Sequence, residues 1–317
     1  MDPSGKVVVL TGITSPGTGN ETAIAQVVAD QLGMSISDIE VVQGDTAVCP
    51  YGLGNYSSRA AIVGVSSAVM AARELKSKIL KVAAHLLEAN ISDLDVHDSK
   101  VFVKDEPARS VSIRDIAMHV YKNIYLLPND IEPGLEVTKY FKTPNVYHIP
   151  DEEGRINTYP IYPYGVNVAV VEVDVDTGAV KILDYYVVHD CGTIINPKFV
   201  EGQLMGGIAQ GIGGAVYEEL VYDKNGSLLT SSFMDYLIPS SLEIPNIQIS
   251  HHITPSPYTL LGSKGVGEGG AEGVSSVLIS AVEDALEDYN IKITKTPLKP
   301  EYIHLLIKEK LSNRSTT

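Results

Sequence analysis

The sequence predicts an α+β protein made of two lobes, each with helices packed against a mixed sheet. Short β-branched runs alternate with stretches in which apolar residues recur at helical spacing, as in residues 6–11 and then 23–33. A proline-rich stretch with few periodic apolar residues covers 126–160. We therefore expect a first lobe over 1–125, a linker or extended wrap over 126–160 and a second lobe over 161–317. The prolines that define the linker are Pro128, Pro133, Pro144, Pro150 and Pro160.

The composition is ordinary for a globular protein, with 44% hydrophobic and 20% charged residues among 317. A net charge of −15 argues against a nucleic-acid partner, because binding nucleic acid needs a cationic surface. Two cysteines, Cys49 and Cys191, are too few for a disulfide framework and are typical of a reducing compartment. No stretch approaches the roughly 20 apolar residues of a membrane helix, and the first ten residues lack a signal-peptide pattern. We therefore expect a cytoplasmic protein without a membrane span.

Periodicity and capping signals place the elements of each lobe. For the first lobe we expect strands at 6–11 and 39–42, a helix at 23–33 ended by Gly33, a helix at 65–88, a hairpin at 94–104, and a helix from Ser112 to 121. For the second lobe we expect a hairpin of 165–175 with 180–188, a helix at 200–214, a hairpin over 218–230, a strand at 247–253, and helices at 274–289 and 300–311.

Two stretches just before helices carry the residue types of an anion-binding site. The first, Gly17 to Thr22, lies between a strand and a helix, where backbone N–H groups and the positive helix end meet a ligand. The second, Ser57-Ser58-Arg59, adds hydroxyls and a guanidinium. An ordinary strand-to-helix turn explains the first equally well, and helix capping alone explains the serines.

The helix expected at 200–214 contains six glycines, each costing about 0.5–1 kcal/mol relative to alanine in a helix interior. Such a helix is tolerated where a helix partner or a ligand packs against bare backbone. Gln203 and Gln210, seven residues apart, lie on the same face of this helix.

Glu268 stands among five glycines in the run from Gly262 to Gly270, just before a predicted helix. A carboxylate in so small a loop is free to reach into a site and accept a proton as a general base. A flexible surface loop with a solvated glutamate is the alternative. His251 and His252 are adjacent on a predicted strand and point to opposite faces, so packing or surface roles are more common for such a pair than metal binding.

Taken together, the glycine-rich stretches resemble the molybdenum-cofactor subunit of the xanthine dehydrogenase, aldehyde oxidase and aerobic carbon monoxide dehydrogenase family. The most specific motif is the run from Ser263 to Gly270, which looks like that family's catalytic-glutamate loop. Residues 17–22 resemble its pterin-side turn, 51–59 its pterin- and phosphate-holding segment, and 196–211 its N-P…G-Q…Q-G segment. The resemblance covers nearly the whole chain, as the C-terminal part of a subunit usually more than twice as long.

The resemblance implies a molybdopterin-binding domain of the molybdenum hydroxylase type, with Glu268 as general base and no metal-ligating side chains. The cofactor-binding residues that it implies are Gly17, Thr18, Gly19, Asn20, Glu21, Thr22, Ser57, Ser58, Arg59, Ala60, Gln203, Gln210, Lys264, Gly265, Val266 and Gly267. Thr18 is a departure, since the family usually has glutamine there.

The activity that the resemblance implies is oxidation of an aldehyde, a purine-like heterocycle or carbon monoxide, with water as the oxygen source. The cofactor is molybdopterin with molybdenum, either as such or as its cytosine dinucleotide. Iron–sulfur clusters and FAD are expected on partner subunits, and the missing N-terminal half on a separate chain. A small molecule is the substrate.

Two other hypotheses remain. A catalytically silent scaffold or assembly subunit would keep the same fold and bind partners only. An unrelated phosphate- or nucleotide-binding enzyme would use the glycine turns, but the sequence has neither a G-x-x-x-x-G-K-[ST] motif nor a full dinucleotide fingerprint.

Overall fold

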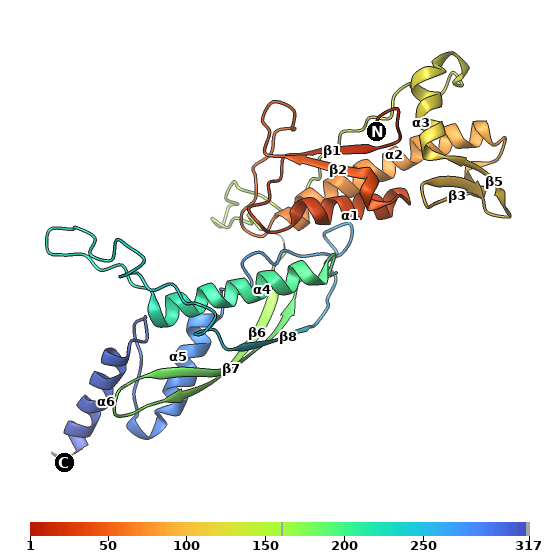
Figure 1. The fold of residues 1–317 in the computed structure, drawn as a ribbon. Coiled ribbons are helices and arrows are strands. Elements are labelled where there is room, and N and C mark those ends of the chain that lie inside the picture. Colours follow the sequence, from red (N-terminus) through yellow and green to blue (C-terminus); the bar gives the residue numbers. More distant parts are fainter. Residues whose placement is uncertain (160, 315–317) are drawn as a thin grey trace. The chain divides into compact units, whose positions relative to one another are not determined.

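The computed structural model describes residues 1–159 and 161–314, and its internal contacts divide the chain into two units (Figure 1). Unit 1 consists of Met1–Ile161 and Pro255–Lys264, and unit 2 of Tyr162–Thr254 and Gly265–Thr317. Pro160 of the predicted linker and residues 315–317 of the predicted second lobe lie outside the described residues. The lobe and linker boundaries drawn from the sequence stay predictions.

Unit 1 begins with a βαβ motif. Strands β1 (Val7–Thr11) and β2 (Ile39–Gln43) pair in parallel, with Val7 opposite Ile39, and helix α1 (Asn20–Leu32) connects them. Gly33 ends α1 with a left-handed φ of 66°, as predicted. The second strand and the helix thereby place the Gly17–Thr22 turn at the carboxyl end of β1.

Helix α2 (Val65–Leu86) packs against α1 and forms the core of this motif. The buried side chains lie three, four or seven apart, as an amphipathic helix requires, and they include Val65, Val69, Ala72, Ile79 and Val82. A π-helical turn, Ala60–Gly64, leads into α2. This π-helical turn packs closely against the loop after β1, because a β-carbon on Gly64 would lie 2.5 Å from Cγ1 of Ile13.

The rest of unit 1 is a three-stranded antiparallel sheet followed by one helix. Strands β3 (Leu94–His97), β4 (Lys100–Val103) and β5 (Glu106–Ser112) lie in sequence order, and α3 (Ile113–Lys122) follows. The predicted hairpin and the cap are confirmed: Ser112 Oγ accepts a hydrogen bond of 3.0 Å from the Asp115 amide. The pattern does not predict β5, because its side chains are largely exposed and show no apolar alternation.

After the turn at Ile124–Leu126, the described residues up to 159 form no helix or strand. Leu135 is buried and ties this segment to unit 1, since the Met1 amino group donates to its carbonyl (2.8 Å) and its amide donates to Tyr121 Oη (3.1 Å). An isolated bridge joins Tyr147 and Asn157. The prolines expected here fit an extended segment that follows the surface of its unit.

Unit 2 contains a mixed sheet, as predicted. Strands β6 (Tyr164–Val173) and β7 (Val180–Asp190) form the expected antiparallel hairpin, and β8 (Asn246–His251) pairs in parallel with β7. The antiparallel neighbour lies on one side of β7 and the parallel one on the other. The loop after β7 and the loop after β8 therefore leave the sheet at the same end.

Helices α4 (Pro197–Ile212), α5 (Val274–Ala285) and α6 (Pro300–Arg314) complete unit 2. Asn196 caps α4 by accepting a hydrogen bond of 3.4 Å from the Phe199 amide, and Pro197 occupies the first turn. The helix predicted at 274–289 ends earlier, at Ala285, and a 3₁₀ turn at Glu287–Tyr289 follows. No helix in the part of the chain that the structure describes is long and apolar enough to span a membrane.

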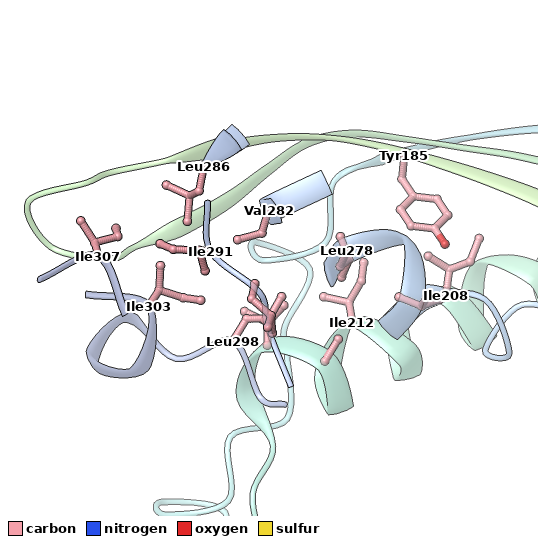
Figure 2. Close-up of a cluster of buried hydrophobic side chains, with 14 of the residues drawn as sticks. Tyr185, Ile208, Ile212, Leu278, Val282, Leu286, Ile291, Leu298, Ile303 and Ile307 are labelled. Atoms are coloured by element: carbon pink, nitrogen blue, oxygen red, sulfur yellow. The ribbon is translucent and has the colours of Figure 1, made fainter. Parts of the chain in front are cut away.

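The core of unit 2 joins the three helices to one face of the sheet (Figure 2). Tyr185 of β7 meets Ile208 and Ile212 of α4 and Leu278 of α5, and all four are fully buried. Burial raises the pKa of Tyr185 to about 12, and its hydroxyl donates a 3.1 Å hydrogen bond to Oδ1 of Asn167. The core thereby fixes α4 and the start of α5 on the same side of the sheet.

One predicted element is absent. The hairpin expected over 218–230 is reduced to a single bridge between Tyr222 and Leu228. Its apolar residues Leu220, Tyr222, Leu228 and Leu229 stay exposed, so no core stabilises a pair of strands here.

Candidate functional site

The turn between β1 and α1 is shaped by two glycines and by side chains that bond to its own backbone. Gly17 and Gly19 have φ values of 104° and 72°, which favour glycine. Asn20 Nδ2 donates to the Thr14 carbonyl (2.9 Å), and the Asn20 amide donates to Ser15 Oγ (3.3 Å). A β-carbon on Gly17 would have no atom within 4 Å. The turn is thus fixed in shape while its outer backbone is open to a ligand.

Glu21 and Thr18 are both engaged beside this turn. The hydrogen bond from the Ser15 side chain holds the pKa of Glu21 below its ordinary value, so the carboxylate is charged at neutral pH. Gln43 Nε2 lies 3.5 Å from Glu21 Oε2. Asn55 Nδ2 donates a hydrogen bond of 3.4 Å to Thr18 Oγ1. The Thr18 hydroxyl therefore joins the turn to the next segment.

That second segment, residues 51–60, lies directly against the first turn. A β-carbon on Gly52 would lie 2.3 Å from the Gly12 carbonyl oxygen, so only glycine allows this approach of two backbones. Together with the Asn55–Thr18 hydrogen bond, this contact brings the residues predicted at 17–22 and 57–60 into one region of unit 1.

Ser57 and Ser58 both adopt left-handed backbone conformations, with φ of 47° and 50°. Such conformations are uncommon for residues other than glycine, and they cluster where a backbone holds a ligand. Arg59 lies half-buried behind them, with Nη1 donating to the Gly54 carbonyl (3.1 Å) and its guanidinium 5.2 Å from the ring centroid of Tyr56. The segment therefore presents two hydroxyls and one oriented cation just before Ala60 and α2.

Ser263, also in unit 1, begins the predicted glutamate-loop motif but is not among the cofactor-binding residues that the resemblance implies. It is 2% exposed, and its Oγ has no hydrogen-bond partner among the residues that the structure describes. The carbonyl of Ser263 accepts a 2.9 Å hydrogen bond from Thr259 Oγ1, which fixes the backbone. A buried hydroxyl left without a partner costs about 1–3 kcal/mol. Ser263 and its buried neighbour Lys264 belong to unit 1, so the start of the glutamate loop lies in the same unit as both glycine segments.

Glu268 lies in unit 2, on a series of tight turns that precede α5. The Gly269 amide donates to the Val266 carbonyl (3.2 Å), and the Ala271 amide donates to the Glu268 carbonyl (3.0 Å). The side chain of Glu268 is exposed. Gln203 Nε2 of α4 donates a hydrogen bond of 3.2 Å to the Gly267 carbonyl. The backbone on both sides of Glu268 is therefore held, while the residue itself is exposed to solvent.

The glutamate loop packs on α4 through bare backbone. A β-carbon on Gly207 would lie 2.9 Å from Cα of Gly270, and one on Gly270 would lie 2.4 Å from the Leu204 carbonyl oxygen. Further along α4, a β-carbon on Gly211 would lie 2.6 Å from the side chain of Val274. These close approaches explain two of the six glycines. The partner is the loop and helix of the same unit, one of the two possibilities raised by the sequence.

His189, at the end of β7, is a second residue that sequence reasoning missed. It is 2% exposed, and its Nε2 would lie 2.4 Å from a β-carbon on Gly269. The ring thus fills the space beside the residue that follows Glu268. No local pattern marks it, because the two positions are eighty residues apart in the sequence.

Along α4 and the turn after it, exposed positions spaced four apart form a strip made largely of glycine. A β-carbon added at Gly202, Gly206 or Gly214 would have no neighbouring atom within 4 Å. Gln210 is exposed and continues the same spacing of four. An exposed helical strip of bare backbone with one amide is open to a flat ligand or to another chain.

Within residues 1–159 and 161–314, no group of three or more His, Cys, Asp or Glu side chains could hold a metal ion. His251 Nε2 lies 3.8 Å from Glu201 Oε1. The structure thus gathers the predicted site residues in two groups: 17–22, 57–60 and Lys264 in unit 1, and Gln203, Gln210 and 265–268 in unit 2. That these groups form one site stays a prediction.

Comparison with known proteins gives a molybdenum-cofactor family, in agreement with the resemblance of the glycine-rich motifs. Residues 1–245 match the family described as molybdopterin cofactor-binding domain. The carbon monoxide dehydrogenase large chain of Hydrogenophaga pseudoflava is 36% identical over 285 residues, covering 90% of this chain and 33% of that one. The nicotine 6-hydroxylase large subunit of Paenarthrobacter nicotinovorans is 38% identical over 303 residues, covering 96% and 35%. The chain thus spans about a third of the length of these relatives.

Solved structures agree. Quinoline 2-oxidoreductase from Pseudomonas putida 86 superposes with a TM-score of 0.86 at 37% identity, over 97% of this chain and 37% of that one. The Cu,Mo-CO dehydrogenase gives a TM-score of 0.86 at 34% identity, over 98% and 37%. The match over residues 1–245, more than half of the sequence, shows that this chain belongs to the molybdopterin cofactor-binding domain family.

Proposed function

We propose that this chain is the C-terminal part of the large subunit of a molybdenum-dependent hydroxylase and carries its general base, Glu268. The observation that supports this most is the glutamate loop. Glu268 is exposed, and its neighbours are held by the hydrogen bond from Gln203 to Gly267 and by the close packing of Gly269 on His189 and of Gly270 on Gly207. A base must be accessible and yet fixed in position, and this loop meets both conditions.

The residues of unit 1 fit a ligand with phosphate and hydrogen-bonding ring edges, as molybdopterin has. The Gly17–Thr22 turn offers open backbone, Ser57 and Ser58 offer hydroxyls, and Arg59 offers a fixed cation for phosphate. The buried Oγ of Ser263 lacks a partner in the described part of the chain and would gain one from the ligand. We assign these residues, with Lys264, to cofactor binding.

The residues of unit 2 that the family resemblance implies also suit a flat ligand with hydrogen-bonding edges. The open strip of Gly202, Gly206 and Gly214 with Gln210 admits a flat ring against helix backbone. Gly265, Val266 and Gly267 lead the chain from Lys264 to Glu268. Gln203 acts by holding Gly267, and a direct contact of its amide with the cofactor stays a prediction.

The reaction we propose is the hydroxylation of an electrophilic carbon with water as oxygen source. In total, substrate and water give the hydroxylated or oxidised product, two protons and two electrons. When bound, the cofactor supplies the molybdenum that takes up the two electrons. Glu268 accepts the proton of the water whose oxygen is transferred, which is the role of a general base and is typically worth about 10²–10⁴-fold in rate. Aldehydes, purine-like heterocycles and carbon monoxide are the substrates we propose.

The partners belong to the same proposal. We propose that the other two thirds of the large subunit are supplied by additional polypeptide, and that iron–sulfur and flavin subunits carry the electrons away. The cytosine dinucleotide form of the cofactor belongs to the same proposal, with Ser57, Ser58 and Arg59 as the phosphate contacts.

The test separates binding from chemistry. The complex that forms around this chain is purified, and its molybdenum and pterin are quantified together with its turnover. Arg59→Ala should lower molybdenum and pterin content while turnover per bound molybdenum stays close to that of the parent complex. A wild-type complex without molybdenum or pterin would contradict the proposal. So would an Arg59→Ala complex with full cofactor content, which would remove Arg59 from the binding site.

A further inference from the structure

A long arm, residues 219–243, leaves unit 2 between the π-helical turn Gly213–Tyr217 and β8. It contains no helix or strand, only the bridge from Tyr222 to Leu228. Figure 1 shows it extending from the C-terminal end of α4. Loops without secondary structure are uncommon beyond about 12–15 residues, and those that occur are usually functional.

The polar side chains of the arm bond to its own turns. Asp223 Oδ1 accepts hydrogen bonds from the amides of Asn225 (2.8 Å) and Ser227 (2.9 Å). Ser232 Oγ donates to Asp235 Oδ2 (2.7 Å). Ser240 donates to Glu243 Oε2 from both its amide (2.7 Å) and its hydroxyl (2.6 Å). These bonds fix the course of the arm without help from a core.

The apolar side chains of the arm point to solvent instead. Phe233, Met234 and Leu242 are 83%, 87% and 91% exposed. The arm's other exposed large apolar residues are Leu220, Tyr222, Leu228, Leu229, Leu237 and Ile238. This arrangement is the reverse of an ordinary surface loop, in which polar groups face water. A dense set of exposed apolar side chains marks a surface that another molecule covers.

The base of the arm is firmly attached to its unit. Tyr236 Oη donates a 2.6 Å hydrogen bond to Glu218 Oε2, and Glu219 pairs with Lys299. Ile244, just after the arm, packs against the buried core of unit 2. Both ends are therefore held and the turns are preformed, so little ordering cost is left for a binding event.

We propose that this arm docks on the polypeptide that supplies the other two thirds of the large subunit. Relatives at 36–38% identity are about three times as long as the matched region, so in them this fold is continuous with a large additional body of polypeptide. The arm provides the apolar contact that such a body requires. The inference rests on the proposed function, because it takes its partner from that proposal.

The test uses the full chain and one defined probe: the polypeptide of the same source that matches the other two thirds of the relatives. In the isolated chain, chymotrypsin should cleave the arm at Phe233 and Leu242, and adding the probe should protect both sites. The double variant Phe233→Ser/Met234→Ser should weaken binding of the probe about tenfold or more, as expected for central apolar anchors. The matched control is Leu305→Ser on α6, which is also an exposed apolar residue at 56% and should bind like the parent.

Five outcomes are decisive. The inference is supported if the probe protects the arm from chymotrypsin and if the double variant binds the probe more weakly while Leu305→Ser does not. Equal binding by the double variant and the parent overturns it, as does an arm that resists chymotrypsin in the isolated monomer. Self-association of the chain that the double variant abolishes, with binding of the probe unchanged, assigns the arm to a second copy. A probe that fails to bind overturns the docking inference, whereas molybdenum and pterin content judges the proposed function separately.

Discussion

The side-chain amide of Gln203 donates a hydrogen bond of 3.2 Å to the carbonyl oxygen of Gly267, the residue before Glu268. The bond crosses from the second turn of α4 to a loop more than sixty positions later in the sequence. It restricts the backbone that carries Glu268, a residue that is exposed to solvent. Gln203 is therefore a positioning residue for Glu268 in this structure.

Replacing Gln203 should loosen the glutamate loop. We expect Gln203→Leu to lower the free energy of unfolding by about 0.5–1.5 kcal/mol, the net contribution of one hydrogen bond. Hydrogen exchange at the amides of residues 267–271 should become faster. The control is Gln210→Leu, an exposed position seven residues along α4, which should leave that exchange unchanged. Unchanged exchange in Gln203→Leu would show that other contacts hold the loop.

Neighbouring glycines of α4 should respond in opposite directions to alanine. Gly207→Ala places a methyl group 2.9 Å from Cα of Gly270, which cannot move aside without shifting the loop, so the melting temperature should fall. Gly206→Ala meets no atom within 4 Å and should stabilise the cofactor-free chain by about 0.5–1 kcal/mol through helix propensity.

The same Gly206→Ala variant also tests the open strip of α4. If the strip holds the cofactor, the added methyl group should lower the molybdenum and pterin content of the assembled complex. Full cofactor content together with higher stability would show that the strip plays no part in binding. Thermal denaturation and metal analysis of the same preparations give both results.

Removing the Glu268 carboxylate should abolish the base but keep the fold. We expect Glu268→Gln to retain molybdenum and pterin, because the amide is nearly isosteric and the side chain is exposed. Turnover per bound molybdenum should fall by about 10²-fold or more, since proton abstraction is lost while positioning stays. Glu272→Gln removes the same charge from an exposed position four residues later and should stay near parent activity. Full turnover by Glu268→Gln would refute the assignment.

Stability of unit 2 should depend on pH through Glu283. A hydrogen bond from Lys292 Nζ (2.8 Å), together with one from the Ile293 amide (2.7 Å), holds the pKa of Glu283 below its ordinary value. A lowered pKa in the folded state contributes stability above the unfolded pKa, and this contribution is lost as pH falls through the folded pKa. We expect the melting temperature to drop with acid in the parent and to drop less in Glu283→Gln. Parallel curves for the two proteins would contradict this role.

The family resemblance and much of the local structure were available from the sequence. Helical spacing of apolar residues predicted α1 and α2, and two β-rich runs around a turn predicted β6 and β7. Gly33 marked the end of α1 and Ser112 the start of α3, because these signals depend on neighbours in the chain. Exposed elements escaped this reasoning. Strand β5 carries few apolar residues, and the expected hairpin over 218–230 does not form because no sheet receives it.

The sequence by itself determined which chemical groups are present: a carboxylate in a glycine loop, two glycine turns before helices, and a helix rich in glycine. Only the tertiary structure decided how these groups are used. It set Gly207 against Gly270, His189 against Gly269, and the Ser263 hydroxyl in a buried position. The physical reason is that close approach and burial are set by residues far apart in the chain, and periodicity and spacing report only on near neighbours.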